Sequence, residues 1–417
     1  MTKYVARRVR FRNGERFSIL SRPGGLPVHE VTLFLAGFRR RGRAANTIHA
    51  VCTTMALLYR ELDKAGIALI ERLRLGQFLT VPEVNRLADA VQYRMADLSD
   101  KRLASSDRPS VIDIKRIRMS RKTGVEEVKA VGAFNQATRI RYMAQYLEFL
   151  SDYYGATLPS RQKKELAHES AFVLKALKGQ IPKVSNRAKL GAREGLSKDD
   201  QDRLLAVIHP DSLDNPWERG FVRLRNWLII VLLLATGMRR GELLGIQIGD
   251  FDQTLPQIKI LRRADVPEDS RLIQPNTKTN DRNVEVRPAI MRAAWDYIMN
   301  RKKIKAARRH PLLIVADDGR PLSLKSIDKM FAQIREACPG LPITLNSHVM
   351  RHTWNERFSE QAELMGLSER REEKARNEQQ GWVDDSKSAA TYTRRYASRK
   401  GREIALKLQE KLDVRGN

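Results

Sequence analysis

Several residues far apart in the chain could together attack a phosphodiester bond. In chain order they are Arg239, Glu242, Lys278, His348, Arg351 and Tyr392. Arginine stays charged and offers paired donors that match two phosphate oxygens, and histidine can transfer protons. A tyrosine nucleophile needs cations nearby, because a reference pKa near 10 leaves roughly one phenol in a thousand ionised at neutral pH. The set therefore predicts a tyrosine nucleophile in a phosphate-binding site.

Arg239 follows Thr236 and Gly237, directly after an apolar run over residues 227–235 that must be buried. We therefore expect its guanidinium to stand at a rigid helix start, where a fixed fork can bind a phosphate. Alternatively, Arg239 is a helix-cap arginine paired with Glu242. Both interpretations of Arg239 hold if Glu242, one turn later, orients Arg239 toward the phosphate.

His348 and Arg351 are one helical turn apart, so we expect both on one face of a helix, with His352 pointing elsewhere. A histidine and an arginine at this spacing can present an acid-base group and a cation to one ligand. Taken alone, such a histidine is more often structural. Lys278, at a predicted turn after a strand, is either a flexible ammonium that reaches a leaving oxygen or a surface lysine.

The charge of the chain indicates a polyanionic partner. The 417 residues include 77 Lys and Arg against 49 Asp and Glu, for a formal net charge of +28. Such a field attracts nucleic acid and makes the binding steeply salt-dependent. A ribosomal or membrane-surface protein could share this charge. Nucleic acid is the leading partner, and the residues above favour DNA.

Cys52 and Cys338 are far apart and lack metal-type spacing, so we expect reduced, packed thiols. The apolar run 227–235 is far shorter than the roughly 20 residues of a membrane span, and Met1 is not followed by a secretory signal. The sequence therefore predicts a cytoplasmic protein without a membrane partner. A Gly-rich Walker sequence and a compact carboxylate cluster are also absent, so neither cofactor nor metal is expected.

The length favours two or three domains, and the apolar spacing predicts mainly helices. Basic and apolar side chains alternate over residues 4–20, on both sides of Asn13-Gly14. This dipeptide predicts a two-residue hairpin turn with positive φ at both positions. A helix is expected from Asn46, with a buried stripe of Ile48, Val51, Cys52, Met55, Tyr59 and Leu62. A second is expected over residues 138–154. Between them, the basic run 115–122 either lies on a phosphate backbone or is simply solvated.

The helical spacing of apolar residues is absent over residues 183–194, and Ser197 then starts an S-x-x-D helix cap. We therefore predict an arm (1–26), a helical DNA-binding region (27–186), a linker (187–194) and a second domain (195–417). In that domain we expect a buried helix ending at Gly237 and a helix from about Arg240. A short strand set with Ile258, Ile260 and Ile273 should follow, and helices to the end. The last helix, over residues 401–412, is expected either to dock on a neighbouring subunit or to cap its own domain.

From about Gly195 onward, the order and spacing of these candidate residues closely resemble the pattern of the tyrosine recombinase (phage integrase) family. The resemblance implies a mainly α fold: a helical core-binding domain and an α-rich catalytic domain with a small antiparallel sheet. It identifies Arg239 with the first catalytic arginine, Glu242 with its acidic companion and Lys278 with the hairpin lysine. His348 and Arg351 match the H-x-x-R pair, Trp382 the later His-or-Trp position and Tyr392 the nucleophile. Residues 33–88 are more loosely similar to the core-binding part.

The chain departs from the usual family pattern near its end. A charged insertion over residues 368–374 is expected to extend a surface helix. Trp382 stands where histidine is more common, and an indole N–H can still donate to a phosphate oxygen. The interval from Trp382 to Tyr392 is one residue longer than usual, which leaves Tyr396 as the reserve nucleophile.

The resemblance implies that Tyr392 attacks the scissile phosphate of double-stranded DNA, leaving a 3′-phosphotyrosine and a free 5′-hydroxyl. It also implies a homotetramer on two recombination sites and a link to DNA integration and mobile elements, while integration, excision and dimer resolution stay open. Whether accessory DNA-bending factors take part stays open. The alternatives are a non-catalytic architectural DNA-binding factor, and a type IB topoisomerase-like enzyme that relaxes DNA without exchanging partners.

Overall fold

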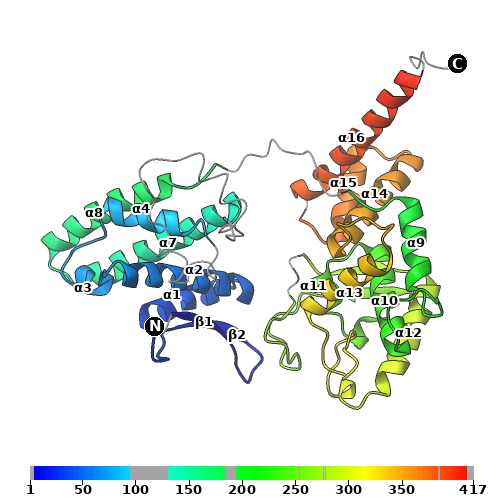
Figure 1. Cartoon of the computed structure of the whole chain (residues 1–417), viewed down its shortest axis with the longest axis horizontal. Coiled ribbons are helices and arrows are strands. Elements are labelled where there is room, and N and C mark those ends of the chain that lie inside the picture. Colours follow the sequence, from blue (N-terminus) through cyan, green and yellow to red (C-terminus); the bar gives the residue numbers. More distant parts are fainter. Residues whose placement is uncertain are drawn as a thin grey trace, which may run out of the picture. The chain divides into compact units, whose positions relative to one another are not determined.

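The computed structural model describes residues 4–93, 130–183 and 194–410, apart from residues 253, 276, 278, 384 and 385. Within these ranges the chain forms two compact units, one over residues 4–11 and 16–183 and the other mainly over residues 194–410 (Figure 1). We call them the N-terminal and C-terminal units. The basic run 115–122, residues 187–193 of the predicted linker and the candidate Lys278 lie outside the described residues.

The N-terminal unit begins with an antiparallel hairpin of β1 (Val5–Arg10) and β2 (Arg16–Ser21), in the register that pairs Arg10 with Arg16. The predicted hairpin is confirmed, but its two-residue turn is wrong. Gly14 has a φ of 88°, whereas Asn13 does not take a positive φ. Asn13 instead accepts the backbone N–H of Glu15 through Oδ1 at 3.1 Å. This local bond favours a wider connection over residues 11–15.

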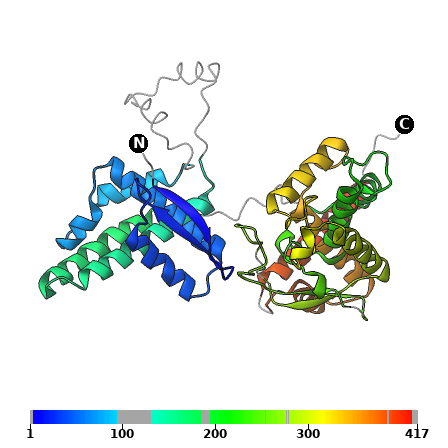
Figure 2. The ribbon, with the colours of Figure 1, turned by 90° about the horizontal axis from the view of Figure 1, so that it is seen from below.

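The other elements of the N-terminal unit within the described residues are helices. They are α1 (His29–Arg40), α2 (Ala45–Lys64), α3 (Leu69–Arg74), α4 (Val81–Ala90), α7 (Ala133–Gly155) and α8 (Ser160–Gly179). The whole predicted stripe of α2, from Ile48 to Leu62, is buried, and β2 packs on this helix (Figure 2). The helix predicted over residues 138–154 is confirmed as α7. Both predictions hold because apolar residues at helical spacing form one continuous face.

The C-terminal unit is also mainly helical. Its elements are α9 (Lys198–Ile208), α10 (Gly220–Thr236), α11 (Arg240–Leu243), η1 (Ile248–Asp250), β3 (Gln257–Ile260), β4 (Arg282–Glu285), α12 (Pro288–Lys302), η2 (Ala307–Arg309), α13 (Leu324–Ala337), α14 (Ser347–Leu364), α15 (Glu369–Gln380) and α16 (Lys387–Glu410). The apolar helix α10 contacts α9, α12 and α14 and forms the centre of the core. Ser197 accepts the Asp200 N–H at 3.1 Å, which confirms the predicted start of α9.

The small sheet of this unit is the antiparallel pair β3 and β4, in which Ile260 pairs with Arg282. Ile258 and Ile260 are buried as the alternation predicts, but Ile273 is exposed and lies outside both strands. The prediction for Ile273 was therefore wrong, because a lone apolar residue does not establish a strand. The mainly α fold with small antiparallel sheets is confirmed.

Cys52 and Cys338 are buried free thiols, as predicted, and burial raises the pKa of Cys52 to about 12.

The prediction of a separate last helix over residues 401–412 is wrong, since α16 runs unbroken from Lys387 through Gly401 to Glu410. Ile404, Leu406 and Leu408 on its last turns are exposed, which disfavours an intramolecular cap. None of the helices in the described ranges combines the length and hydropathy that a bilayer crossing requires.

Candidate active site

The carboxyl end of α10 is the point on which the candidate site is assembled. Gly237 ends the helix in the left-handed conformation, with a φ of 61°. Arg351 of α14 donates from Nη1 to the Gly237 carbonyl oxygen at 2.6 Å. Trp354 donates to Ala235 O at 3.1 Å, and Gln380 of α15 to Thr236 O at 3.2 Å. Helix ends leave carbonyl groups unpaired, so these donors fix α14 and α15 to α10.

Glu242 collects the charged groups of the site. Its side chain is 0% exposed, and its carboxylate accepts the Arg239 backbone N–H at 3.0 Å and Arg282 Nη2 at 2.8 Å. Thr279 Oγ1 donates to it at 2.8 Å, and Arg239 Nη1 at 3.2 Å. Burial acts to raise the pKa of Glu242, but Arg282, Arg351 and the Arg239 N–H outweigh it and leave this pKa below its ordinary value. Glu242 is therefore an ionised anchor for the arginines.

The predicted pairing of Arg239 with Glu242 is present, and Arg239 is still 30% exposed. Arg239, Arg282 and Arg351 face a single buried carboxylate, so this corner keeps an excess of positive charge. Burial, then the like charge of Arg239, lowers the pKa of Arg351 to about 10. An anion placed here would relieve that repulsion.

Trp382 joins Arg351 to Tyr392. The Arg351 guanidinium carbon lies 5.1 Å from the centroid of the Trp382 ring. The Trp382 and Tyr392 rings stack with centroids 5.9 Å apart and planes 6° from parallel. Two donors here, Arg351 Nη2 and Trp382 Nε1, are buried without a hydrogen-bond partner among the described residues. A buried donor left unpaired is costly, and this makes both nitrogens candidates for binding a ligand oxygen.

Of the two histidines of α14, His352 lies differently from what the sequence predicted. His348 is an exposed residue in the first turn of α14, and its backbone N–H donates to Asn346 Oδ1 at 2.8 Å. His352 was expected to point away from the site, and this is wrong. Its ring centroid is 5.6 Å from that of Tyr392, and Arg395 Nη1 lies 3.5 Å from its Nδ1. Helical spacing separated His352 from Arg351 correctly but could not show that α16 would pack on the other face.

The reserve nucleophile, Tyr396, lies in a different environment from Tyr392. Its side chain is buried, and its hydroxyl donates to Glu363 of α14. Burial and then the bond to Glu363 raise the pKa of Tyr396. The cations over its ring are Arg399 and Lys400 of its own helix. The geometry therefore favours Tyr392, whose ring contacts Trp382 and, through it, Arg351.

Sequence reasoning missed Arg282 and Thr279 as parts of this site. Both follow the candidate Lys278 in one short polar segment, which was the available signal. Their bonds to Glu242 join residues about forty positions apart, which no local pattern reveals. The backbone N–H of Asn280 also donates to Gly381 O at 2.8 Å, so this segment is attached to the turn that carries Trp382.

The expected surface helix over the insertion 368–374 is wrong in one respect. A helix, α15, does begin at Glu369, but Glu372 is buried and ion-paired with the fully buried Arg376. The charged composition suggested solvent exposure. The structure shows that part of this charge is paired internally, between α14 and α16.

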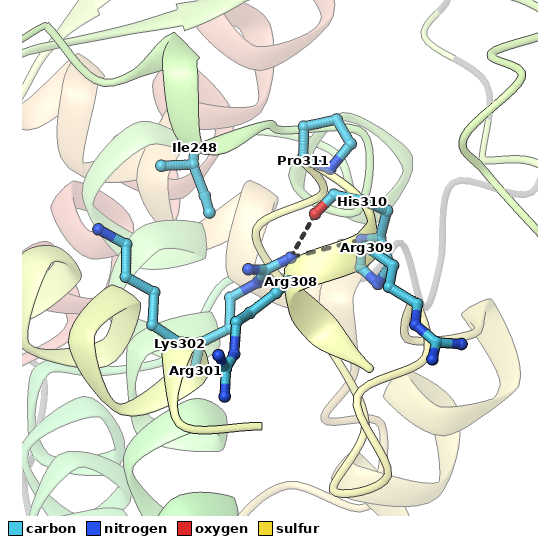
Figure 3. Close-up of a pocket in the computed structure, with 7 residues that line it drawn as sticks. All are labelled: Ile248, Arg301, Lys302, Arg308, Arg309, His310 and Pro311. Atoms are coloured by element: carbon cyan, nitrogen blue, oxygen red, sulfur yellow. Dashed lines mark hydrogen bonds between the residues drawn. The ribbon is translucent and has the colours of Figure 1, made fainter. Parts of the chain in front are cut away.

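A basic pocket lies among residues other than these candidates (Figure 3). It holds about 720 Å³ and is lined by Ile248, Arg301, Lys302, Arg308, Arg309, His310 and Pro311. Arg301 is buried and donates to the carbonyl oxygens of Ala307 and His310, both at 2.7 Å, so it supports the backbone. The pocket contains none of the predicted site residues. Within the described ranges, no cluster of His, Cys, Asp and Glu could hold a metal ion.

Residues 195–369 match the model of the phage integrase family. The chain carries a phage integrase family domain. This confirms the resemblance to tyrosine recombinases. The matched segment of the phage integrase domain includes Arg239, Glu242, Arg282, His348 and Arg351, whereas Trp382 and Tyr392 follow it.

The chain also aligns with curated relatives. Tyrosine recombinase XerD of Halalkalibacterium halodurans is 27% identical over 143 residues, covering 34% of this chain and 43% of the relative. Tyrosine recombinase XerC of Staphylococcus haemolyticus is 26% identical over 131 residues, covering 31% of this chain and 39% of the relative. The chain thus spans less than half the length of these relatives.

Solved structures similar to the chain include a lambda integrase dimer bound to a core site, with a TM-score of 0.42 and 12% identity over 80% of this chain and 89% of that one. XerA recombinase has a TM-score of 0.35 and 17% identity over 87% of this chain and 92% of that one.

Proposed function

We propose that the protein is a site-specific tyrosine recombinase that cleaves and rejoins double-stranded DNA through a 3′-phosphotyrosine. One observation carries this proposal: Tyr392 stacks on Trp382, which itself lies against Arg351, beside the cluster of Arg239, Glu242 and Arg282. A phenol, two unpaired donors and an excess of positive charge thus meet in one unit.

In the proposed reaction, the scissile phosphate lies between the arginines and Tyr392. The exposed part of Arg239 binds its oxygens, and Arg351 and Trp382 donate through Nη2 and Nε1 after a small side-chain movement uncovers them. Tyr392 Oη bonds to phosphorus as the bond to the 5′-oxygen breaks. We assign Lys278 to protonating that leaving oxygen and His348 to proton transfer or phosphate binding. A 5′-hydroxyl of the partner strand then reverses the step.

The arginine geometry suits the charge that develops during this reaction. The phosphorus gains negative charge at its oxygens in the transition state, and donors already held in place stabilise that charge without reorganisation. Glu242 holds Arg239 and Arg282, and Gly237 holds Arg351, so these guanidiniums are positioned before DNA binds. The net charge of +28 supports attraction of the DNA itself.

We further propose that residues 27–186 bind the core of the recombination site and that residues 195–417 form the catalytic domain. The exposed apolar residues Ile404, Leu406 and Leu408 on α16 support docking on a neighbouring subunit in a homotetramer on DNA. We further propose that the protein acts in the cytoplasm.

A nicked duplex that traps the cleaved state tests the proposal. The duplex carries the tightest-binding sequence that in vitro selection with this protein recovers. We expect a covalent adduct whose phosphorylated peptide contains Tyr392, and strand exchange when two such sites are supplied. An adduct without exchange would favour a topoisomerase-like enzyme. Tight binding without an adduct would favour a non-catalytic DNA-binding factor.

A further inference from the structure

Arg376 is a fully buried arginine on α15 that the proposed chemistry does not use. Its guanidinium is paired with Glu372 one turn earlier and donates from Nη2 to Ser359 Oγ of α14 at 2.6 Å. Ser359 in turn donates to Glu372 at 2.7 Å. These bonds form a closed polar group between α14 and α15.

The second half of the guanidinium reaches α16. Arg376 Nη1 donates to Thr393 Oγ1 at 3.1 Å and to the Ala389 carbonyl oxygen at 3.3 Å. The guanidinium carbon lies 5.9 Å from the centroid of the Tyr392 ring. Ala389 and Thr393 are one turn apart on either side of Tyr392, so the bonds fix the turn of α16 that carries the phenol.

Burial of this ion pair is not explained by stability alone. Desolvation of two charges is expensive, and packed apolar side chains of similar volume often stabilise a protein as well or better. What an apolar side chain cannot do is bind oxygen atoms on three helices in one fixed geometry. A planar guanidinium with five N–H donors can.

We propose that Arg376 is a positioning residue, which sets the orientation of Tyr392 for attack by tying Ala389 and Thr393 of α16 to Ser359 of α14 and Glu372 of α15. The inference rests on the proposed function, since it gives Tyr392 the role of nucleophile. It adds Arg376, which lies outside the phosphate-binding cluster, as a residue on which the rate of cleavage depends.

The test measures single-turnover cleavage of the nicked duplex at saturating enzyme, with DNA affinity measured separately. Thr393→Val removes one acceptor and keeps the buried ion pair, and we expect cleavage to slow about tenfold. Arg376→Met should slow it about a hundredfold, because small misplacements of a reacting group have effects of this size. Arg371→Met, at an exposed arginine of the same helix, is the matched control and should cleave normally.

A double variant separates positioning from folding. Arg376→Met alone leaves the Glu372 charge buried without its partner and should lower Tm by on the order of 10 °C. Arg376→Met with Glu372→Leu removes both charges and should recover most of the stability. We expect its cleavage to stay slow, with the amide hydrogens of residues 389–393 exchanging faster than in the parent protein. Cleavage that recovers together with Tm would overturn the inference.

The leaving group provides a further discrimination. A duplex with sulfur in place of the bridging 5′-oxygen has a leaving group that needs no proton. It should leave the defect of Thr393→Val and Arg376→Met unchanged, because the attacking phenol is misplaced in both. Rescue by the sulfur substrate would overturn the positioning role. A parent protein that forms no adduct at all would overturn the proposed function. If the parent and the variants all cleaved at the same rate, only this inference would be overturned.

Discussion

The two sides of the candidate site are built by different means. On the arginine side, each guanidinium is bound to the end of α10 or to Glu242, and those groups are buried in the C-terminal unit. On the tyrosine side, Tyr392 sits on a helix whose fixed turn is bound by side-chain contacts to Arg376, Trp382 and His352. The difference indicates that the proposed phosphate site is built into the fold, while the position of the proposed nucleophile depends on a small set of polar and ring contacts.

The comparison is tested most severely at the tyrosine side. Tyr392→Phe should abolish the covalent adduct, because the nucleophilic oxygen is gone, while DNA affinity stays within about twofold. Adduct formation on the nicked duplex, followed by denaturing electrophoresis, measures this. Tyr396→Phe is the matched control and should keep forming adduct, since its hydroxyl is bound to Glu363. If Tyr396→Phe lost the adduct and Tyr392→Phe kept it, the assignment of the nucleophile would be reversed.

On the arginine side, Arg351→Lys should slow cleavage by about a hundredfold or more. The lysine keeps a charge but loses the fork that binds Gly237 and a phosphate oxygen together, and one lost donor costs about 3 to 4 kcal/mol in such sites. Single-turnover rates at saturating enzyme check this. Arg357→Lys, at an exposed position of the same helix, should cleave normally. Equal rates for both variants would remove Arg351 from the site.

Glu242→Gln should reduce the free energy of unfolding by about 3 to 5 kcal/mol near pH 7, because Arg282 then stays buried without its carboxylate. The pKa of Glu242 is lowered in the folded protein. Its stabilisation is therefore complete above the unfolded pKa of roughly 4.3 and is lost as the pH falls through the lower folded pKa. Denaturant unfolding from pH 7 to pH 3 should show the gap to the parent narrowing only below about pH 4.

The control for that experiment is Glu378→Gln, at an exposed position of α15. It should change the free energy of unfolding by less than about 0.5 kcal/mol at every pH. A gap between Glu242→Gln and the parent that stayed constant down to pH 3 would contradict the role of Glu242 as an ionised anchor.

Gly237→Ala should lower the free energy of unfolding by roughly 3 kcal/mol. A β-carbon there would lie 2.7 Å from Trp354 Cδ2, and the φ of 61° disfavours any residue with a side chain. Gly366→Ala isolates the conformational part, because Gly366 has a φ of 65° with no atom within 4 Å of an added β-carbon. It should cost about 1 kcal/mol. Equal losses by calorimetry would mean that Trp354 yields to the new methyl group.

The smallest effect on stability is expected at the exposed end of α16. Leu406 is 62% exposed, so Leu406→Lys should change the free energy of unfolding by less than about 0.5 kcal/mol. Binding to one half-site should also stay unchanged, whereas assembly on two sites, followed by gel shift, should weaken. Unchanged assembly would leave the apolar end of α16 without a role in docking.

The sequence predicted the elements in which local pattern and burial agree. The apolar stripe from Ile48 to Leu62, the buried helix ending at Gly237 and the Ser197 cap all depend on residues within a few turns of one another. The pairing of Arg239 with Glu242 is equally local. These interactions are strong at short range, so spacing alone identifies them.

What the sequence could not predict depends on contacts between distant segments. The bond of Arg282 to Glu242 and the burial of Arg376 beneath α16 join residues that no periodicity relates. Charged residues such as Glu372 are usually solvated, so pattern reasoning placed that helix at the surface. The nearness of His352 to Tyr392 likewise arises from helix packing, which a single helix pattern does not contain.

The near-parallel stacking of Trp382 on Tyr392 has an optical consequence. An indole stacked beside a phenol ring has its emission and its near-ultraviolet dichroism altered by that neighbour. The protein therefore contains a built-in reporter at the place where bond exchange is proposed. In a variant whose other tryptophans are replaced, displacement of the phenol would register as a change in light, in real time and without any attached dye.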